Sequence, residues 1–359
     1  MIPIMRPKLP SADRIVPYLR GIDATRIYSN FGPLTLSLED RLSSHFGLTA
    51  GSVATVTNAT IGLTLALQAQ GARPGTLCAM PAWTFVASAH AAMLAGLTPY
   101  FIDVDPGTCA LAPEAIDAAL AGVRDSIGAV MPVFPFGQPI DVAAWDLYGA
   151  RTGLPVVIDA AAGFDALEPG RTPAVVSLHA TKVIGVGEGG FVISDDARLV
   201  RDVRTRSNFG FAGTREATVP SVNAKLSEYH AALGHAALDE WHETRAEWMT
   251  AAGMYRRAFA ESNQVRLQPG FGESWVTSTC VLHLDYAAVR AERALAAAQI
   301  ASRRWWGLGA HAHRATMSLP RGALPTTQIL AETTIAVPFF RDLGSTVVEQ
   351  VVDCLRNPP

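Results

Sequence analysis

The feature that most constrains the fold is a regular alternation of short apolar runs with longer alanine- and leucine-rich segments in the first half of the chain. Short apolar runs bounded by turn residues are typical of buried strands, and the longer segments between them are typical of helices. The apolar runs cover residues 52–56, 77–81, 99–104, 128–134, 155–160, 174–178 and 190–194. Helices are predicted at residues 60–70, 84–95, 113–123 and 141–152.

Strands that are apolar along their whole length and alternate with helices indicate a mostly parallel sheet covered on both faces. We therefore predict an α/β protein whose large domain holds a mostly parallel, seven-stranded sheet. The last run, 190–194, follows its neighbour through the loop GVGEGG without a crossover helix. That strand is expected to pair antiparallel.

From about residue 221 the pattern changes. Residues 221–262 are predicted to form one long helix or two consecutive helices, and the remainder mixes short strands with helices before a final amphipathic segment, TVVEQVVDCL. We predict a large domain over residues 1–240, including the N-terminal segment, and a smaller α+β domain over residues 241–359.

Charge and cysteine content narrow the classes of function. A formal net charge of -3 gives no basic surface for nucleic acid or anionic membranes. The four cysteines show no CxxC spacing, which indicates neither a metal site nor disulfides and fits a reducing compartment. The N-terminal MIPIMRPKLP lacks the long apolar core of a signal peptide, and the uncharged stretches 53–72 and 83–102 carry polar residues that suit strand–helix pairs. We predict a soluble, cytoplasmic protein that binds neither nucleic acid nor membrane.

Polar residues follow several predicted strands, and open α/β sheets bind ligands at the carboxyl ends of their strands. The first strand is followed by TNAT (57–60), which is either an anion site at a helix N-terminus or an ordinary N-cap. Asp159 ends the fifth strand and would pair with a protonated ring nitrogen, or else act as a cap or ion-pair partner. Trp83 is either a stacking surface for a flat ligand or a core aromatic, and His179 is either a hydrogen-bonding site residue or a core histidine.

Lysine is rare in this sequence. The chain has 29 basic side chains, but only Lys8, Lys182 and Lys225 are lysines. An amine can lose its proton and form a Schiff base with an aldehyde, whereas a guanidinium cannot. Lys182 lies between a predicted strand and a glycine-rich loop, which favours amine chemistry, while Lys225 is either a phosphate contact or a surface charge. A phosphate site, a stacking ring, a buried acid and a reactive lysine together indicate pyridoxal phosphate.

Several stretches resemble, in order and spacing, the DegT/DnrJ/EryC1/StrS aminotransferases, which are fold-type-I, pyridoxal-phosphate-dependent enzymes that act on nucleotide sugars. They are TNATIGLTLALQAQGARPG, MPAWTFVASAHAAMLAGLTPYFIDVD, PVFPFGQPID, VVIDAAAGFDA, SLHATKVIGVGEGGFVISDD, SNFGF and VNAKLSEYHAALG. The resemblance runs from about Tyr28 to the C-terminus.

The resemblance implies a role for each matching residue. Lys182 holds the cofactor covalently, Asp159 faces the pyridinium nitrogen, and Trp83 occupies the ring-stacking position. The phosphate is bound by the backbone of Ala59 and by Thr60 and Ser177. It is also reached by Asn223 of the neighbouring subunit, which places the active site at a homodimer interface. Lys225 stands where many members have arginine.

Two positions depart from the family pattern. Ala162 stands where many members have glutamine near the cofactor hydroxyl, and Phe134 stands where the histidine of a PVH motif is usual. In the C-terminal part, the segment SRRWWGLGAHAHRA (302–315) holds a cluster of arginine, aromatic and histidine residues, namely Arg303, Arg304, Trp305, Trp306, His311 and His313. The segment is either a site for a nucleotide diphosphate and its base, with Arg304 and His311 as candidate substrate contacts, or an amphipathic surface strand.

The resulting hypothesis is an aminotransferase that moves an amino group from L-glutamate to a keto-sugar nucleotide. The expected acceptor is a 4-keto-6-deoxyhexose linked to a nucleoside diphosphate, used for surface polysaccharide or secondary-metabolite sugars. A dehydratase branch of the family has histidine in place of the lysine, so Lys182 favours transamination. The alternatives are another pyridoxal-phosphate reaction on the same fold, such as decarboxylation, desulfuration or aldol cleavage, and a regulatory protein without turnover. A nicotinamide enzyme is disfavoured because no GxGxxG follows the first strand.

Overall fold

Seven short strands form the framework of the fold in the computed structural model, which describes residues 1–356. They are β1 (Val53–Val56), β2 (Leu77–Pro81), β3 (Thr98–Ile102), β4 (Ile127–Val130), β5 (Ile158–Asp159), β6 (Ala174–Ser177) and β7 (Gly190–Ile193). All seven coincide with the apolar runs of the sequence. Six of them are shorter than the predicted runs, and β4 and β5 are shortened most. Pro132 and Pro155 lack the N–H that a regular ladder needs at the end of β4 and before β5.

The seven strands are divided between two sheets, where the sequence predicted one. Strands β3, β2 and β4 form a parallel three-stranded sheet, and β1, β7, β6 and β5 form a four-stranded sheet. Two parallel bridges, from Val130 to Val156 and from Val133 to Asp159, connect the sheets in the order β3-β2-β4-β5-β6-β7-β1. β7 pairs antiparallel with both β6 and β1, as the loop before it predicted.

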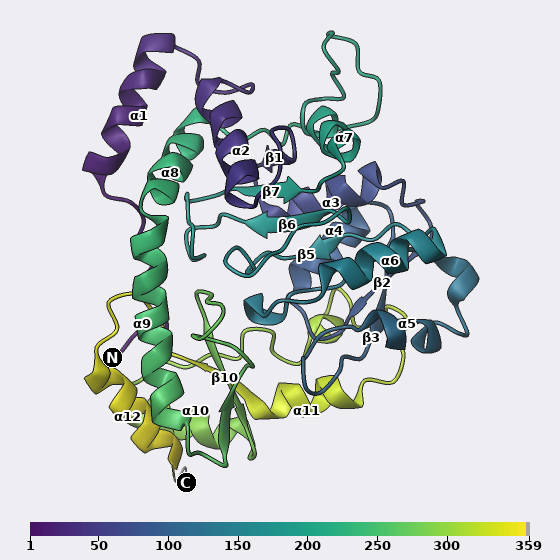
Figure 1. Ribbon diagram of the computed structural model, residues 1–359. Helices are drawn as coiled ribbons and strands as arrows, with labels where there is room; N and C mark the ends of the chain where they lie inside the picture. The colour runs from purple at the N-terminus through teal and green to yellow at the C-terminus, as the bar shows by residue number, and fades with distance from the viewer. Residues whose placement is uncertain (357–359) are drawn as a thin grey trace.

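Helices cover both faces of these strands (Figure 1). Successive strand residues enter different apolar clusters: Val53 and Ala79 face one side, and Ala54 and Met80 face the other. One side is covered by α3 (Ala59–Ala69), α4 (Val86–Leu94) and α7 (Ala197–Ser207). The other side is covered by α2 (Pro33–His45), α5 (Pro113–Ala119) and α6 (Val142–Thr152). This confirms the prediction of an α/β protein with helices on both faces.

Two consecutive helices lead from the large sheet to the C-terminal part. Helices α8 (Glu228–Asp239) and α9 (Trp241–Phe259) run down one side of the molecule (Figure 1), and α1 (Ala12–Thr25) packs against α8. The C-terminal strands β8 (Val265–Leu267), β9 (Cys280–Leu284) and β10 (Thr334–Val337) form an antiparallel sheet in the order β10-β9-β8. The remaining elements are α10 (Ala288–Ala297), α11 (Pro325–Thr333), α12 (Ser345–Arg356) and the 3₁₀ turns η1 (Arg124–Ser126), η2 (Pro135–Gly137) and η3 (Ala310–Ala312).

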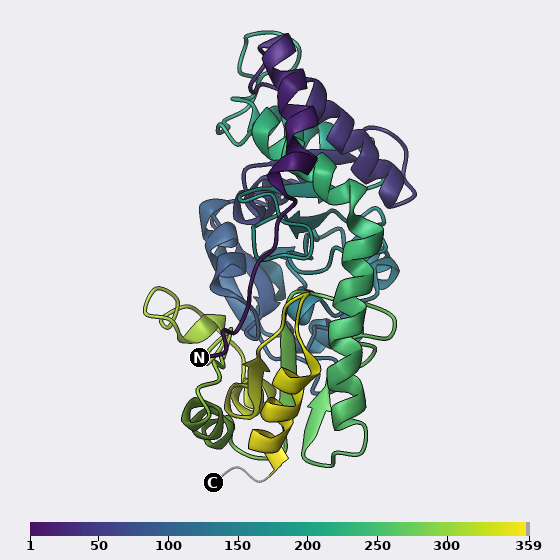
Figure 2. The ribbon, with the colours of Figure 1, turned by 90° about the vertical axis from the view of Figure 1, so that its left-hand side faces the viewer.

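The first residues of the chain lie against this C-terminal part. Ile2 forms a parallel bridge with Ile300, and the carbonyl oxygen of Ile4 accepts a hydrogen bond of 3.0 Å from the amide of Phe339. Figure 2 shows the N-terminal segment running from α1 down to the C-terminal part. One apolar cluster also continues from the large sheet into the C-terminal part. The division at residue 240 therefore stays a prediction, and residues 357–359 of the predicted second domain lie outside the described residues.

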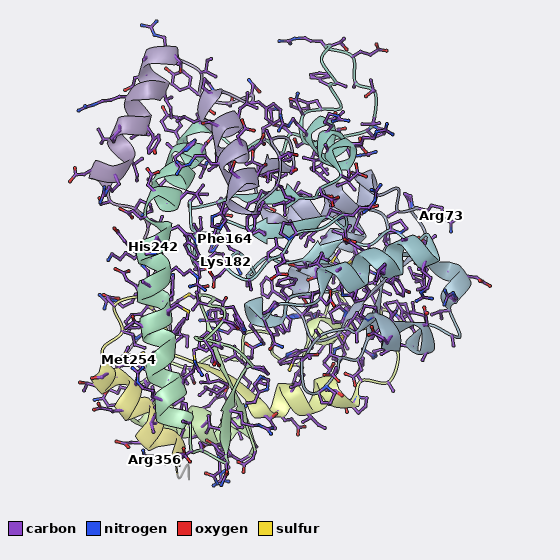
Figure 3. The ribbon with its side chains drawn as sticks, in the orientation of Figure 1. Arg73, Phe164, Lys182, His242, Met254 and Arg356 are labelled. Carbon is purple, nitrogen blue, oxygen red and sulfur yellow. The ribbon has the colours of Figure 1, made fainter. Side chains whose placement is uncertain are left out.

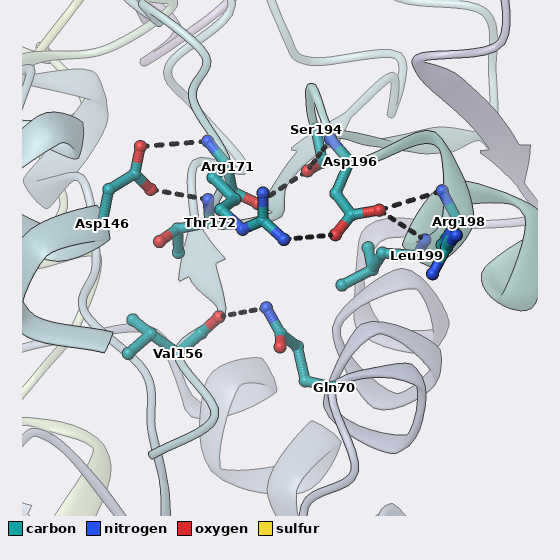
Figure 4. A network of polar contacts seen from close by, with 9 residues as sticks. All are labelled: Gln70, Asp146, Val156, Arg171, Thr172, Ser194, Asp196, Arg198 and Leu199. Atoms are coloured by element: carbon teal, nitrogen blue, oxygen red, sulfur yellow. Dashed lines mark hydrogen bonds and ion pairs between the residues drawn. The ribbon is translucent and has the colours of Figure 1, made fainter. Parts of the chain in front are cut away.

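A polar network closes the end of the sheet where β6 begins (Figure 4). The carboxylate of Asp146 accepts hydrogen bonds from the amides of Arg171, at 3.0 Å, and Thr172, at 2.6 Å. The Arg171 guanidinium pairs with Asp196 at 3.2 Å, and Asp196 caps the N-terminus of α7. This network ties α6 and α7 to the start of β6, at the opposite end of that strand from Ser177. Within residues 1–356, no helix is both long and apolar enough to cross a bilayer.

Helix α3 lies unusually close to the sheet because residue 62 has no side chain. A Cβ at Gly62 would lie 2.8 Å from Val175 Cγ1 and 3.1 Å from Val56 Cγ2, and both valines are fully buried. We expect Gly62→Ala to lower the free energy of unfolding by about 1–3 kcal/mol through overpacking, although alanine favours helix.

The matched control is Gly21→Ala in α1, where a Cβ would meet nothing within 4 Å. It should leave stability unchanged or raise it by about 0.5–1 kcal/mol. Urea denaturation followed by circular dichroism measures both variants. Equal effects of the two substitutions would contradict close packing of α3 on the sheet.

Candidate active site

A cavity of about 560 Å³ is lined by residues that directly follow or end five of the large-domain strands. These residues are Asn58 to Thr60 after β1, Thr84 and Phe85 after β2, Val133 and Phe134 after β4, Asp159 at the end of β5, and Ser177 at the end of β6. The C-terminal part completes the wall with Ser278, Thr279, Arg303, Trp305 and Trp306. The cavity therefore lies where open α/β sheets bind ligands.

Lys182 lies in this cavity, near the middle of the molecule (Figure 3). The turn that carries it is closed by backbone hydrogen bonds of 2.8 Å from Lys182 N to the His179 carbonyl and from Ala180 N to the Gly187 carbonyl. Burial lowers the pKa of Lys182 by removing water from the ammonium group, and the charge of Asp159 partly opposes this shift. A lysine with a lowered pKa more readily presents the neutral amine that attacks a carbonyl.

Asp159 is the buried acid of the cavity, with 6% of its surface exposed. Its Oδ2 accepts a hydrogen bond of 2.6 Å from Ser88 Oγ, and its Oδ1 accepts one of 3.0 Å from the amide of Ala161. Burial raises the pKa of Asp159, while the two hydrogen bonds and the charge of Lys182 oppose the rise. A buried carboxylate in this position is stabilised by a cationic or protonated partner.

The N-terminus of α3 contributes backbone amides to the wall. Asn58 is the N-cap, and its Oδ1 accepts a hydrogen bond of 3.0 Å from Ile61 N, so the capping role weighed for Asn58 is confirmed. Ala59 and Thr60, in the first turn, line the cavity. A Cβ at Gly190 would lie 2.9 Å from Ala59 N, so glycine is required beside this turn. The first-turn amides of a helix have no partner within it, and together with the hydroxyl groups of Thr60 and Ser177 they suit an anion.

Trp83 is buried in this structure, and its role as a stacking surface for a flat ligand stays a prediction. Trp83 is 1% exposed and is not among the described residues that line the cavity. Its ring packs edge-to-face against Phe136 and Trp306, which do line it, so Trp83 is a core aromatic. Phe85, two residues later, is 55% exposed and belongs to the wall.

The structure separates Arg304 and His311 from the cavity. Arg304 makes a bidentate ion pair with Glu292, with hydrogen bonds of 2.9 and 2.7 Å, and is not among the described wall residues. His311 packs on the ring of Phe101, and burial lowers its pKa. The contact of Arg304 and His311 with a substrate stays a prediction. Arg303, one residue earlier in an extended segment, lies in the wall instead.

Of the other predicted site residues, His179 lies in the wall of the cavity, and Asn223 and Lys225 lie outside it. His179 lines the cavity, and its Nδ1 lies 2.9 Å from Thr181 Oγ1. Asn223 is exposed and lies outside the wall of its own chain, where it pairs with Asn208. Lys225 is half-buried, with its Nζ 4.3 Å from the ring centre of Phe209, and burial lowers its pKa. The roles of Asn223 and Lys225 stay predictions.

Both departures from the family pattern lie in the wall. Ala162 and Phe134 line the cavity, and a Cβ at Gly163 would come within 2.5 Å of the Phe134 ring. The wall near Asp159 is thereby more apolar than the family pattern implies. Ser88 and Phe85 were not predicted from the sequence, and Arg303 was predicted only as one member of the cluster in residues 302–315. The spacing of Thr84 and Ser88, four residues apart at the start of a helix, was the one available signal for Ser88.

The residues present fit pyridoxal phosphate. Lys182 supplies an amine of lowered pKa for the aldehyde, and Asp159 supplies a carboxylate for a ring nitrogen. The first turn of α3, with Ala59 and Thr60 in the wall, and the hydroxyl group of Ser177 suit a phosphate group. Phe85 offers an exposed aromatic surface at the wall.

Comparison with known proteins adds independent information. The sequence profile of the DegT/DnrJ/EryC1/StrS aminotransferase family matches residues 11–356. Protein Rv3402c of Mycobacterium tuberculosis H37Rv is 35% identical over 283 residues, covering 74% of this chain and 67% of that protein. The dTDP-4-amino-4,6-dideoxy-D-glucose transaminase of Shigella dysenteriae is 30% identical over 260 residues, covering 71% and 69%. The crystal structure of DesI with its TDP-sugar product has a TM-score of 0.88 and 28% identity, covering 99% of this chain and 92% of DesI.

Removing the Ser88 hydroxyl should change the ionisation of Asp159. The hydrogen bond from Ser88 favours the charged carboxylate, so Ser88→Ala should raise the pKa of Asp159 further and make it take up a proton at higher pH. Infrared difference titration of the protonated carboxyl band, assigned by its loss in Asp159→Asn, measures this shift.

The control is Ser207→Ala. Ser207 is also fully buried, but its hydroxyl donates to the backbone carbonyl of Arg204. The carboxyl band should titrate as in the unmodified protein. An unchanged titration in Ser88→Ala would mean that this hydrogen bond does not tune Asp159.

Proposed function

Because the chain belongs to the DegT/DnrJ/EryC1/StrS aminotransferase family, we propose that it transfers an amino group from L-glutamate to the keto group of a nucleoside-diphosphate sugar. The chain is a pyridoxal-phosphate-dependent aminotransferase. The observation that carries the proposal is the presence of Lys182 and Asp159 in one cavity, each with its pKa displaced by burial.

Bound pyridoxal phosphate supplies the aldehyde that takes up the amino group and the ring that accepts the electrons of the substrate carbon. The amine of Lys182 holds the cofactor in the resting enzyme and, once free, carries a proton at Nζ between the reacting atoms. Hydrogen bonds from Ser88 and from the amide of Ala161 hold the Asp159 carboxylate, which would accept a hydrogen bond from the protonated ring nitrogen of the cofactor. The amides of α3, with Thr60 and Ser177, orient the phosphate.

The acceptor that we propose is a 4-keto-6-deoxyhexose linked to a nucleoside diphosphate. The Shigella relative is named for a 4-amino-4,6-dideoxyhexose carried on dTDP. The cavity volume of about 560 Å³ lies in the usual range for small-molecule sites. L-Glutamate as the donor comes from the family resemblance.

A visible absorption spectrum tests the cofactor, the lysine and the donor together. The purified enzyme with pyridoxal phosphate should show the band of the lysine-bound cofactor, and L-glutamate should bleach it. Lys182→Arg keeps the positive charge but cannot form the covalent bond, so it should show no such band. Lys8→Ala should retain both the band and the bleaching.

Each outcome bears on a different part of the proposal. A band that glutamate leaves unchanged would reject glutamate as the donor. A band that persists in Lys182→Arg would reject Lys182 as the residue that holds the cofactor.

We further propose a homodimer in which Asn223 reaches the phosphate of the neighbouring subunit. Val222 precedes Asn223, and the Phe209 amide donates to the Val222 carbonyl at 3.1 Å. These two residues, together with Ile27, Tyr28 and Tyr229, are apolar or aromatic side chains that are 42–48% exposed in the monomer. Tyr28 and Tyr229 stack on each other with ring centres 6.2 Å apart. Exposed apolar residues of this kind favour an interface between subunits.

Mixing two inactive variants tests whether Asn223 acts across the interface. Lys182→Ala removes the amine, and Asn223→Asp places a negative charge beside the phosphate, so each homodimer should be inactive or nearly so. In a mixed dimer, one site combines an intact Lys182 with an intact Asn223 from the other subunit. We expect co-expression of differently tagged variants to restore about half of the activity per mixed dimer.

Asn223 acting within its own chain predicts that the mixed dimer stays inactive. A monomer in sedimentation velocity would reject the interface itself. Mixing Lys182→Ala with Asp159→Asn gives a matched control, because these two residues line the same cavity of one chain and their mixture should not recover activity.

A further inference from the structure

Arg303 is the one arginine among the described residues that line the cavity, and Lys182 is the one lysine. The proposed function commits Lys182 to amine chemistry. The acids of the wall, Asp159 and Glu188, come from the large domain. The fixed positive charge of the C-terminal wall is therefore carried by Arg303.

The charge of Arg303 has no acidic partner in residues 1–356. No carboxylate there lies within ion-pair distance of its guanidinium, whereas the neighbouring Arg304 is fully engaged by Glu292 at 2.7 Å. Adjacent residues of an extended segment point to opposite sides. The chain thus pairs one arginine internally and leaves the next one exposed at the cavity.

The backbone and one aromatic ring hold Arg303 in place. Its amide donates to the Ala336 carbonyl at 3.1 Å, and its carbonyl accepts from the Ala336 amide at 2.8 Å, which fixes the residue to β10. Its guanidinium carbon lies 4.8 Å from the ring centre of Trp305. Stacking on an indole restricts a guanidinium while leaving its N–H groups free to bind a ligand.

Trp305 carries a second unused donor. Its Nε1 is buried, and no hydrogen-bond acceptor for it lies in the described part of the chain. Leaving a buried indole N–H without a partner is unfavourable, and most buried polar groups in proteins have a hydrogen-bond partner. Trp305 also lines the cavity.

We propose that Arg303 and Trp305 form the site that anchors the oxyanion of a substrate in this cavity. This inference rests on the proposed function, in which both substrates are anions. The oxyanion is either a carboxylate of the amino donor or a phosphate of the nucleotide acceptor. The guanidinium supplies two parallel N–H donors to either group, and the Trp305 indole adds a third donor.

Binding to the enzyme loaded with pyridoxal phosphate tests the site without turnover. The probes are dTDP and UDP, which share a diphosphate, and glutarate, which has two carboxylates and no amine. Isothermal titration calorimetry of the unmodified enzyme, Arg303→Ala, Arg303→Lys and Trp305→Phe gives their dissociation constants. Arg314→Ala is the matched control, because Arg314 is exposed and lies outside the wall.

Arg303→Ala should weaken the anchored class of probe by about tenfold to a hundredfold. Arg303→Lys should recover part of this loss, since lysine keeps the charge but not the fork. Trp305→Phe should weaken binding by about twofold to tenfold. Melting temperatures should stay close to that of the unmodified enzyme, because Arg303 is exposed.

The pattern of losses identifies the source of the oxyanion. Weakened dTDP and UDP with unchanged glutarate assigns the site to the acceptor phosphate, and the reverse assigns it to the donor carboxylate. Equal affinities in Arg303→Ala and the unmodified enzyme overturn the proposal, as does an unmodified enzyme that binds none of the probes. Bleaching of the visible band by glutamate is measured separately, so transamination can hold while this site fails.

Discussion

The burial of Lys182 and Asp159 in one cavity is the constraint on which the rest of the active site depends. Burial disfavours the charged form of each group, so it lowers the pKa of the amine and raises that of the acid. Their mutual attraction only partly offsets this effect. A cofactor that bonds to the amine and pairs with the carboxylate through a protonated nitrogen relieves both penalties. The protein therefore keeps an unfavourable pair of groups ready for one particular ligand.

The scaffold holds this pair by backbone geometry more than by side-chain contacts. Asp159 is the last residue of β5. Its amide donates to the Pro132 carbonyl and its carbonyl accepts from the Phe134 amide, so the carboxylate has little freedom to move. Lys182 lies in a turn closed by hydrogen bonds across its base. Gly62 and Gly190 let α3 lie close to the sheet and to the start of β7, which brings the first-turn amides of α3 to the cavity. The polar network of Asp146, Arg171 and Asp196 lies at the start of β6, and the cavity lies at the opposite end of that strand, where Ser177 is.

The C-terminal part gives the site its second wall and much of its apolar character. Trp306 stacks on Phe136 with ring centres 3.7 Å apart, which joins the two parts of the molecule across the cavity. Ala162 and Phe134 remove polar groups that the family pattern would place near the cofactor. A substrate that enters this cavity meets aromatic surface on the C-terminal side and the fixed charge of Arg303. Under the proposed function, we expect selectivity for the acceptor to depend on both parts of the chain.

The sequence by itself determined the order of strands and helices and the antiparallel β7, because local apolar periodicity is visible without coordinates. It also singled out Lys182, because lysine is rare in this chain, and Asp159, because a carboxylate that ends an apolar run is unusual. It also located the segments around Trp83 and Arg304, but not the residues within them that face the cavity. Trp83 and Phe85 lie two residues apart at a bend, and Arg303 and Arg304 are neighbours in an extended segment, so position in the sequence does not show which member of each pair faces the cavity. Packing between segments distant in sequence sets that orientation: Trp306 and Phe136 cover Trp83, and Glu292 binds Arg304. Only the tertiary structure brings those partners together.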